Sequence, residues 1–500
     1  MATTDKSVCI QVEWIGGGSV VANGVELKPD GFFTIDATDD GLIELSTTGD
    51  VRIKHLDCSG NSLSALDVST CPELERLDCY HNHLTTLDVT NCKELWWLSC
   101  GNNSLSVLDV TKCSKLTHLE CSYNSLTELD VFYCTELIYI SCLSNSLSAL
   151  HVADCLKLEH LSCSNNSISA LDITNCPKLE YLNCVYNSLT ALDVTSCTEL
   201  QYLSCGNNSL KTLDADNCSK LTELWGYHNL LITLHFTNCA ELTILYCSNN
   251  SLTDLDVTNC PELTKLACGN NSLTRLDVTN CPNLEHLDFE YNTLTELDVS
   301  DCPNLEYLNC DYNSISALDL TNCQELTVLS CKDNSLRDLN IIDCSKLTKL
   351  DCNQNYLTNL YIFNNPELAI LNCGNNALST LHITNCPVLE ELYCDKNSLM
   401  DLDITACRKL TKLRAHHQTA VLRMAIPNDN ELSIENPVTF FGVKADIDNI
   451  RPSGAYANGI ITWTVSGDDG ETSFRFTTEL PNGINGKPFS GTAIQPWTTK

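Results

Sequence analysis

LDCYHNHLTTLDVTNCKELWWL, residues 77–98, is the stretch that decides the fold. Its pattern of leucine, cysteine and asparagine recurs every 21 residues, and the asparagine returns from Asn61 to Asn397 in 17 copies without a slip. A period of about 20–50 residues is the signature of a solenoid. Each unit is too short to bury its own apolar face, so the units must stack on one another.

Two short segments of each unit alternate between apolar and polar residues. Leu77 and Cys79 form the first alternation, and Leu87 and Val89 form the second. Period two indicates a strand with one face inward. We expect two extended segments per coil, a parallel sheet on at least one side of a flattened tube, and very little helix. The asparagine is predicted to bond backbone groups freed where the strand turns.

The 32 cysteines follow the same period in two columns. One column lies three residues before the asparagine, interrupted by Gly226 and Phe289, and the other lies ten residues after it, interrupted by Asn365. Columns in register with the leucines favour reduced, buried packing residues. Disulfides between adjacent coils are the alternative, because stacked strands lie about 4.8 Å apart. Metal sites are disfavoured by the absence of C-x-x-C.

Composition narrows the class of protein. The net charge of −35 disfavours nucleic acid and anionic membranes as partners. No stretch approaches the roughly 20 apolar residues of a membrane span, and no secretory signal follows Met1. The chain has no nucleophile elbow, glycine-rich phosphate loop or H-E-x-x-H motif. We therefore expect a protein that is not an enzyme, with no cofactor and no metal.

The pattern L-x-x-L-x-C-x-x-N-x-L resembles the leucine-rich repeat, and its division into 10 and 11 residues is similar to the nested 21-residue class of bacterial proteins. The resemblance covers residues 56 to about 418. It implies that the L-x-C strands line a concave face, whose outward positions form the surface that binds partners.

The period divides the chain into three predicted regions. Residues 1–55 are expected to form an N-terminal β cap with a degenerate capping coil, and 56–419 a solenoid of 17 repeats plus a partial terminal coil. Residues 420–500 alternate between β-branched or aromatic and polar residues, with turns rich in Gly, Asn and Asp. This pattern is typical of a β-sandwich. The expected fold class is an all-β-rich solenoid with a C-terminal Ig-like β-sandwich.

The tail motifs 436–438, 454–456, 460–463, 474–476 and 489–496 resemble the Ig-like domain that follows the repeats of internalins. That family consists of bacterial surface proteins, several of which bind host receptors through the concave face. The resemblance implies adhesion to a protein or glycan ligand and an extracellular or cell-surface location. Internalins have a 22-residue repeat and a helical cap, so host-cell invasion is not carried over.

Outward aromatic residues mark the candidate ligand-binding surface. The position before the first leucine of L-x-C is aromatic in six consecutive repeats: Trp97, His118, Tyr139, His160, Tyr181 and Tyr202. The least regular repeat adds Trp225 and Tyr227, with Tyr246 expected beside Trp225. Exposed aromatic side chains favour binding. The alternative is sheet stabilisation of about 0.2–1 kcal/mol per cross-strand pair, or neutral drift in the irregular repeat.

Aspartate occupies 12 of 17 copies of the middle position in L-D-V, as at Asp88, Asp109 and Asp172. Stacked carboxylates could be bridged by Ca²⁺. The stronger interpretation is that each accepts hydrogen bonds from the backbone or from the threonine two residues on.

The leading hypothesis is an internalin-like surface or secreted binding protein. The alternative is a structural spacer or a self-assembling surface or filament subunit, and an enzyme accessory module comes third.

Overall fold

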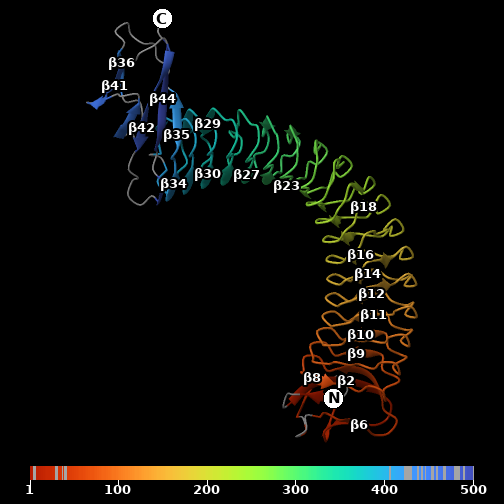
Figure 1. Ribbon diagram of the computed structural model, residues 1–500. Helices are drawn as coiled ribbons and strands as arrows, with labels where there is room; N and C mark the ends of the chain where they lie inside the picture. Colours follow the sequence, from red (N-terminus) through yellow and green to blue (C-terminus); the bar gives the residue numbers. More distant parts are fainter. Residues whose placement is uncertain are drawn as a thin grey trace. The chain divides into compact units, whose positions relative to one another are not determined.

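The computed structural model describes residues 1–3, 7–28, 32–36, 38, 42–404 and 407–421, and the strands named below between 431 and 498. The chain forms two compact units, residues 1–252 and 253–500. Within each unit, short strands stack coil by coil (Figure 1), and the described residues contain no helix. The predicted solenoid of parallel strands with little helix is therefore confirmed.

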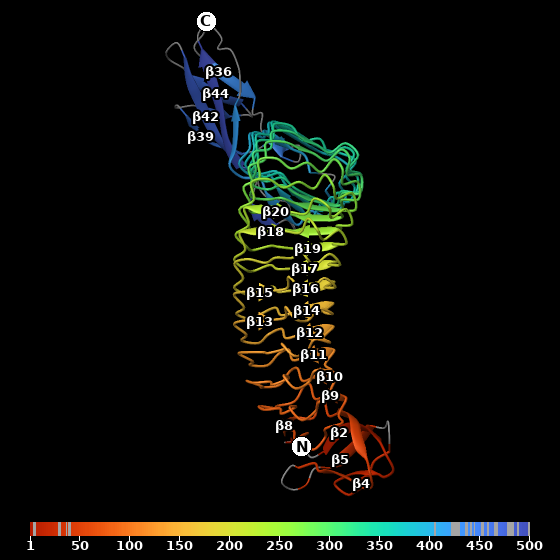
Figure 2. The same cartoon turned by 90° about the vertical axis from the view of Figure 1, so that its right-hand side faces the viewer.

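The first unit is built on one parallel sheet, in which every strand pairs with the equivalent strand one repeat further on (Figure 2). Its outward side is called the sheet face below. The register shift is one repeat, so that Trp97 lies opposite His118. The strands are β7 (Arg52–Asp57), β9 (Arg76–Asp78), β10 (Trp97–Ser99), β11 (His118–Glu120), β12 (Tyr139–Ser141), β14 (His160–Ser162), β16 (Tyr181–Asn183), β17 (Tyr202–Ser204), β19 (Glu223–Trp225) and β21 (Ile244–Tyr246).

The second unit repeats this arrangement. Strand β43 (Asn485–Lys487) continues its sheet by pairing in parallel with the last coil. The strands are β22 (Lys265–Ala267), β23 (His286–Asp288), β25 (Tyr307–Asn309), β27 (Val328–Ser330), β28 (Lys349–Asp351), β30 (Ile370–Asn372), β32 (Glu391–Tyr393) and β34 (Lys412–Arg414).

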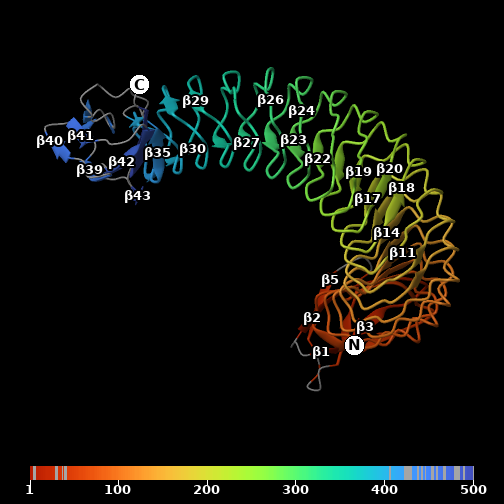
Figure 3. The same ribbon diagram turned by 45° about the horizontal axis from the view of Figure 1, so that its top comes forward.

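The second side of the coils forms strand pairs only in places (Figure 3). The expected strand at Leu87 and Val89 does not form, because this segment pairs with no neighbouring coil. The Asp88–Thr90 bond is not the cause, because Asp172 makes the same bond with Thr174 in a strand that does pair. The pairs are β13 (Leu150–His151) with β15 (Leu171–Asp172), β18 (Thr212–Asp214) with β20 (Thr233–His235), β24 (Leu297–Asp298) with β26 (Leu318–Asp319), and β29 (Asn359–Ile362) with β31 (Thr380–Ile383).

Antiparallel strands begin the chain. Strand β2 (Ser7–Ile15) pairs with β7 and with β5 (Phe32–Asp36). Strand β3 (Val20–Ala22) pairs with β4 (Val25–Glu26) and β6 (Leu45–Thr47). The β3–β4 turn has positive φ at Asn23 and Gly24, the conformation that Asn-Gly hairpins favour. Strand β1 (Ala2–Thr3) pairs with β8 (Leu63–Ala65).

The C-terminal segment is also β. One sheet has the order β35 (Gln418–Val421), β44 (Ser490–Thr498), β42 (Asp469–Thr477) and β39 (Asp446–Arg451). Another joins β36 (Glu431–Glu435), β41 (Ile460–Thr464) and β40 (Ala455–Ala457), and a third joins β33 (Asp401–Leu402), β37 (Thr439–Phe440) and β38 (Val443–Lys444). Residues 436–438, 454 and 489 of the tail motifs lie outside the described residues. The Ig-like assignment and the boundaries at 55/56 and 419/420 stay predictions.

The asparagine column hydrogen-bonds successive coils to each other. The Asn82 Oδ1 atom accepts the Leu63 N–H at 2.9 Å, and Nδ2 donates to the carbonyls of Cys58 and Cys79 at 3.0 Å. The column ends at Gln418, whose Oε1 accepts the Leu399 N–H at 3.0 Å. The predicted bonding of freed backbone groups is thus present.

Both cysteine columns belong to the core. All 32 cysteines are free thiols, and all are buried except the exposed Cys9 and the half-buried Cys71. Burial raises the pKa of Cys113 to about 12, and its Sγ donates to the Val89 carbonyl at 3.7 Å. The prediction of buried packing cysteines is confirmed.

Candidate functional site

Six aromatic side chains form one continuous stack along the sheet face of the first unit, called the aromatic ladder below. Parallel strands in register place equivalent positions about 4.8 Å apart, close to the spacing of stacked rings. The planes of neighbouring rings differ by 6–24°. The centroid separations are 4.8 Å for Trp97–His118, 6.0 Å for His118–Tyr139, 4.4 Å for Tyr139–His160, 4.2 Å for His160–Tyr181 and 4.4 Å for Tyr181–Tyr202.

Stacking determines which part of each ring meets solvent. The faces of the inner rings are covered by their neighbours, so these half-buried residues present mainly their edges. The next outward position of each strand is usually a small residue and is shielded. Ser141, for example, is only 4 % exposed, and its hydroxyl shares a hydrogen bond with that of Ser122 at 2.8 Å. Ser99, Ser162 and Ser204 are buried in the same column.

The ladder lies in an uncharged part of a strongly acidic chain. The strand-to-asparagine segments 139–144, 160–165, 181–186 and 202–207 contain no Asp, Glu, Lys or Arg, and we call their outward side the neutral field. Burial lowers the pKa of His160, so it is neutral at physiological pH. Burial also lowers the pKa of His118, in the preceding coil. A partner would meet hydroxyls, amides and ring edges here without displacing ionic hydration.

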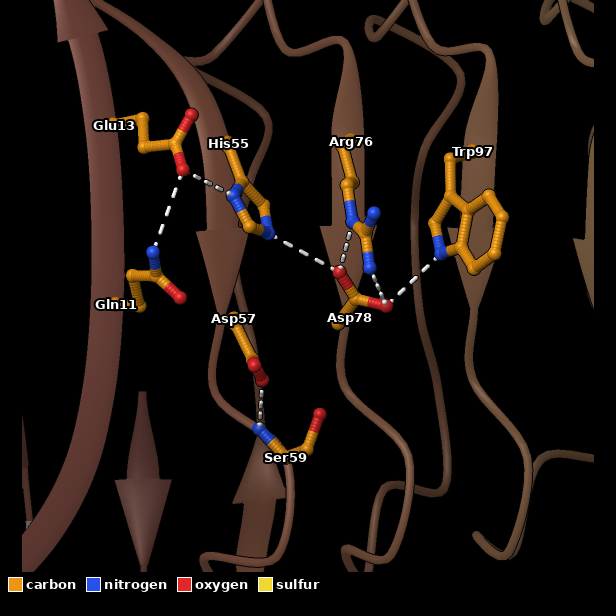
Figure 4. A network of polar contacts seen from close by, with 8 residues as sticks. All are labelled: Gln11, Glu13, His55, Asp57, Ser59, Arg76, Asp78 and Trp97. Carbon is orange, nitrogen blue, oxygen red and sulfur yellow. Dashed lines mark hydrogen bonds and ion pairs between the residues drawn. The ribbon is translucent and has the colours of Figure 1, made fainter. Parts of the chain in front are cut away.

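A polar network fixes the first ring of the ladder (Figure 4). The Asp78 carboxylate accepts the Trp97 Nε1–H at 2.9 Å and the Arg76 Nε–H at 2.6 Å, and it lies 3.1 Å from His55 Nε2. The other His55 nitrogen lies 3.1 Å from the Glu13 carboxylate on β2. The Arg76 guanidinium covers the Trp97 ring at 4.5 Å from its centroid.

Titration in this network follows from its hydrogen bonds. The bond with Asp78 is the main reason that the pKa of His55 lies above its usual value, and Glu13 adds to it. Burial alone would raise the pKa of Asp78, but bonds from His55, Arg76 and Trp97 hold it below the usual range. Sequence reasoning missed this network. Its only signal was the pair Arg76 and Asp78 on one face of the strand before Trp97.

The irregular repeat lies on the same sheet face but outside the stack, because Glu223 and Ile244 occupy its ladder positions. Trp225 and Tyr246 meet edge to face, with centroids 4.5 Å apart and planes at 75°. Tyr227 lies over Gly206, where a Cβ atom would come within 2.9 Å of its ring. The structure therefore brings together Trp225 and Tyr246, as predicted, and leaves all three aromatics half-exposed.

The aspartate column is occupied by local hydrogen bonds. Asp88 Oδ1 accepts the Thr90 N–H at 2.9 Å and the Thr90 hydroxyl at 2.6 Å, and these bonds lower the Asp88 pKa. Asp109 and Asp172 do the same with Thr111 and Thr174. Across the described ranges, no three His, Cys, Asp or Glu side chains group as metal ligands.

Comparisons with known proteins agree with this architecture. A family model described as leucine-rich repeats (2 copies) matches residues 157–194 and 282–322, and one described as LRR adjacent matches 448–498. No curated protein matches the chain. In the parts of the chain that the structure describes, no helix has the length and apolar character for crossing a bilayer.

Three solved structures illustrate the likeness. The functional domain of InlJ from Listeria monocytogenes, which includes a cysteine ladder, is 29 % identical, with a TM-score of 0.61 over 89 % of this chain and 90 % of that one. YopM from Yersinia enterocolitica is 28 % identical, with a TM-score of 0.59 over 73 % and 79 %. The Leptospira interrogans LRR protein LIC12759 is 24 % identical, with a TM-score of 0.55 over 68 % and 89 %, which shows the fold alone.

The repeat body is therefore a leucine-rich repeat solenoid with a cysteine ladder, as the sequence predicted. Solenoids of this kind use the extended surfaces of their stacked repeats for binding.

Proposed function

We propose that this chain is an internalin-like adhesion protein of the bacterial surface, or a secreted one, that holds a protein partner against the sheet face of its first unit. The likeness to InlJ along nearly the whole chain supports the internalin-like assignment. The role proposed is binding and not catalysis. The aromatic ladder and the neighbouring Trp225, Tyr227 and Tyr246 would supply the contacts.

The neutral field is the observation that carries this proposal. Its outward residues are mostly Tyr, Ser, Asn and Gly, the residue types that dominate antibody paratopes. Tyrosine supplies a large contact area at low conformational-entropy cost, and stacking reduces that cost further by fixing each ring before the partner arrives. Charged residues are depleted from the centres of protein interfaces, as they are here.

Ring geometry favours a protein over a glycan as the partner. A sugar that stacks on an aromatic residue needs a free ring face, but the inner faces of the ladder are covered at centroid separations of 4.2–6.0 Å. Ring edges and tyrosine hydroxyls suit the mixed apolar and polar groups of a protein surface.

The experiment blocks the neutral field without disturbing the stack. Asn165→Lys places a charge on the sheet face at a positive φ of 55°, and the same column carries Lys396 at the same φ. The matched control is Ser169→Lys, outside the sheet face, in the column that carries Lys211. Both positions are exposed, and both substitutions change the charge equally.

Wild type and both variants are presented to surface proteins of candidate host cells and to a glycan array. We expect a protein partner that Ser169→Lys retains and Asn165→Lys loses. Equal capture by both variants would contradict the proposal. End-to-end association of the purified chain, without capture of any foreign protein, would favour the structural alternative.

A further inference from the structure

A small polar cavity opens on the sheet face of the second unit, far along the sequence from the aromatic ladder. Its volume is about 400 Å³, within the usual range for a small-molecule site. Three cations border it, together with carboxylate and amide side chains: Lys332, Lys396, Arg414, Asp351, Asp395 and Asn353. We propose that this cavity binds a sugar acid, with its carboxylate at the cations and its hydroxyls at the Asp and Asn side chains. The inference does not depend on the proposed function.

The cations are the first observation. The chain has 29 Lys and Arg against 64 Asp and Glu, so three cations on one small cavity run against its composition. In the described part of the chain, none of the three forms an ion pair with a carboxylate within 4.0 Å. Lysines elsewhere in the chain do form such pairs, as Lys412 does with Glu391.

Aromatic rings hold two of these cations in place. The Lys332 ammonium lies 4.7 Å from the centroid of Tyr312 and donates to the hydroxyl of that residue. The Arg414 guanidinium lies 5.8 Å from the centroid of Tyr393. Cation–π contacts position the charges without neutralising them. A carboxylate entering the cavity would therefore find donors that are already oriented.

The other polar side chains of the cavity indicate which class of anion it would bind. Asp351 is already engaged, because it accepts the Asn353 N–H and the Asn372 side-chain N–H, each at 3.0 Å. The half-buried Asp395 also lines the cavity. A carboxylate beside the cations repels phosphate, which carries more than one negative charge at pH 7, more strongly than it repels a singly charged carboxylate, and it accepts hydroxyl donors. Asn side chains can both donate to and accept from a hydroxyl.

A glycine makes room for this arrangement. A Cβ atom at Gly374 would lie 2.9 Å from Asn353 Nδ2 and 3.2 Å from the Asp395 carbonyl oxygen. In three other coils, a glycine at the equivalent position is covered by a side chain of the next coil: Gly101 by Glu120, Gly206 by Tyr227 and Gly269 by Glu290. At Gly374, groups from both neighbouring coils approach the glycine.

The test uses the full chain at about 0.15 M salt, where repulsion by distant carboxylates is screened. Binding of D-glucuronate is measured by saturation-transfer NMR and calorimetry, with D-glucose as the neutral probe and inorganic phosphate as the anion without a sugar. Arg414→Gln and Lys396→Gln remove cavity cations, and Lys349→Gln removes a sheet-face lysine that does not line the cavity. Asp395→Asn removes the carboxylate.

We expect saturable glucuronate binding that weakens roughly tenfold in Arg414→Gln and in Lys396→Gln and is unchanged in Lys349→Gln. Glucose and phosphate should bind more weakly, and Asp395→Asn should raise phosphate binding towards that of glucuronate. Absence of saturable glucuronate binding would overturn the proposal. Equal losses in Lys349→Gln, or phosphate binding as tight as glucuronate in wild type, would also overturn it. Asn165→Lys lies in the other unit and should leave glucuronate binding intact, which separates this result from the test of partner capture.

Discussion

At the residue scale, the second cysteine column combines packing with a weak hydrogen bond. Cys113 fills the core and also donates to a carbonyl 24 residues earlier, the same offset at which Asn365 donates to Ile341 at 3.2 Å. Asn365 is completely buried and its Oδ1 has no partner. This position therefore favours a small side chain that can donate a hydrogen bond. A thiol does so without adding a second buried polar atom that would need its own hydrogen-bond partner, as the Asn365 amide does.

Substitution by alanine should change the stability of the protein in opposite directions at two glycines of neighbouring coils. At Gly226 a Cβ atom meets only Leu224 and Leu231 at 3.5 and 3.7 Å, ordinary contact distances. Gly226→Ala should therefore stabilise the protein by about 0.4–1 kcal/mol, because it restricts the unfolded chain. Gly206→Ala should destabilise it, since the new methyl group displaces the Tyr227 ring. Urea unfolding measures both, and a loss of stability in Gly226→Ala would contradict this account.

His55 should make the N-terminal part of the first unit sensitive to pH. Its folded-state pKa is raised by Asp78 and Glu13, so its contribution is full below the unfolded pKa of about 6.5. That contribution is lost as the pH rises through the raised folded value. His55→Gln should therefore cost most stability in mildly acidic solution and least in alkaline solution. Denaturation of both proteins across this range, with NMR titration of the ring, measures the effect, and a pH-independent difference would refute it.

At the element scale, the asparagine column is what couples one strand to the next at the turn. Asn187 Oδ1 accepts the Ile168 N–H at 2.9 Å, and Nδ2 donates to Cys163 and Cys184 at 3.0 and 3.1 Å. These bonds replace water for backbone groups of two coils at once. The column therefore sets the register of the sheet as well as its stability.

Asn187→Ala should destabilise the first unit by roughly 2–4 kcal/mol, because it leaves buried backbone groups of two coils without partners. Asn217→Ala is the control: it is exposed, makes one bond at 3.2 Å to Thr195, and should change stability by less than about 0.5 kcal/mol. Amide hydrogen exchange should show the loss of protection centred on Ile168, whose N–H loses its acceptor. Similar losses of stability in the two variants would show that an asparagine of the column contributes no more to stability than an exposed asparagine does.

Sequence alone predicted the elements that depend on a short period. The L-x-C strands follow from alternation, and the aromatic ladder follows from the 21-residue repeat that puts Tyr181 beside Tyr202. The missing strand at Leu87 was not predicted, because Leu87 and Val89 alternate as Leu171 and Ile173 do in a coil whose strand pairs. The network at Asp78 was missed as well. It needs β2 to pair antiparallel with β7, a contact across some forty residues that no repeat encodes.

At the scale of the whole molecule, both units share one core chemistry. Leucines and thiols repeat from the first coil to the last, and 30 of the 32 cysteines are buried. Burial raises the pKa of Cys92 and of Cys344 to about 12, so the thiols of both units stay protonated. Protonated, shielded thiols react slowly with alkylating agents and oxidants.

Alkylation with iodoacetamide should therefore modify Cys9, and Cys71 more slowly, in the folded protein, and all 32 cysteines in denaturant. Intact-mass spectrometry counts the modified sites, and peptide mapping identifies them. Rapid alkylation of many cysteines under native conditions would show that the columns are open to solvent. An intact mass of the untreated protein that is lower by two hydrogen atoms for each pair of cysteines would show disulfides between coils.

The bond pattern of Asn187, which reaches back 19 and 24 residues, is the same at nearly every asparagine of the column. A gene that encodes such a chain can recombine between its own near-identical segments. Each product would gain or lose whole coils, and every remaining amide would still meet the partners it had before. The number of coils can therefore change in whole steps through natural variation. Such a change alters the length of the solenoid, whereas the hydrogen bonds inside and between the remaining coils stay the same.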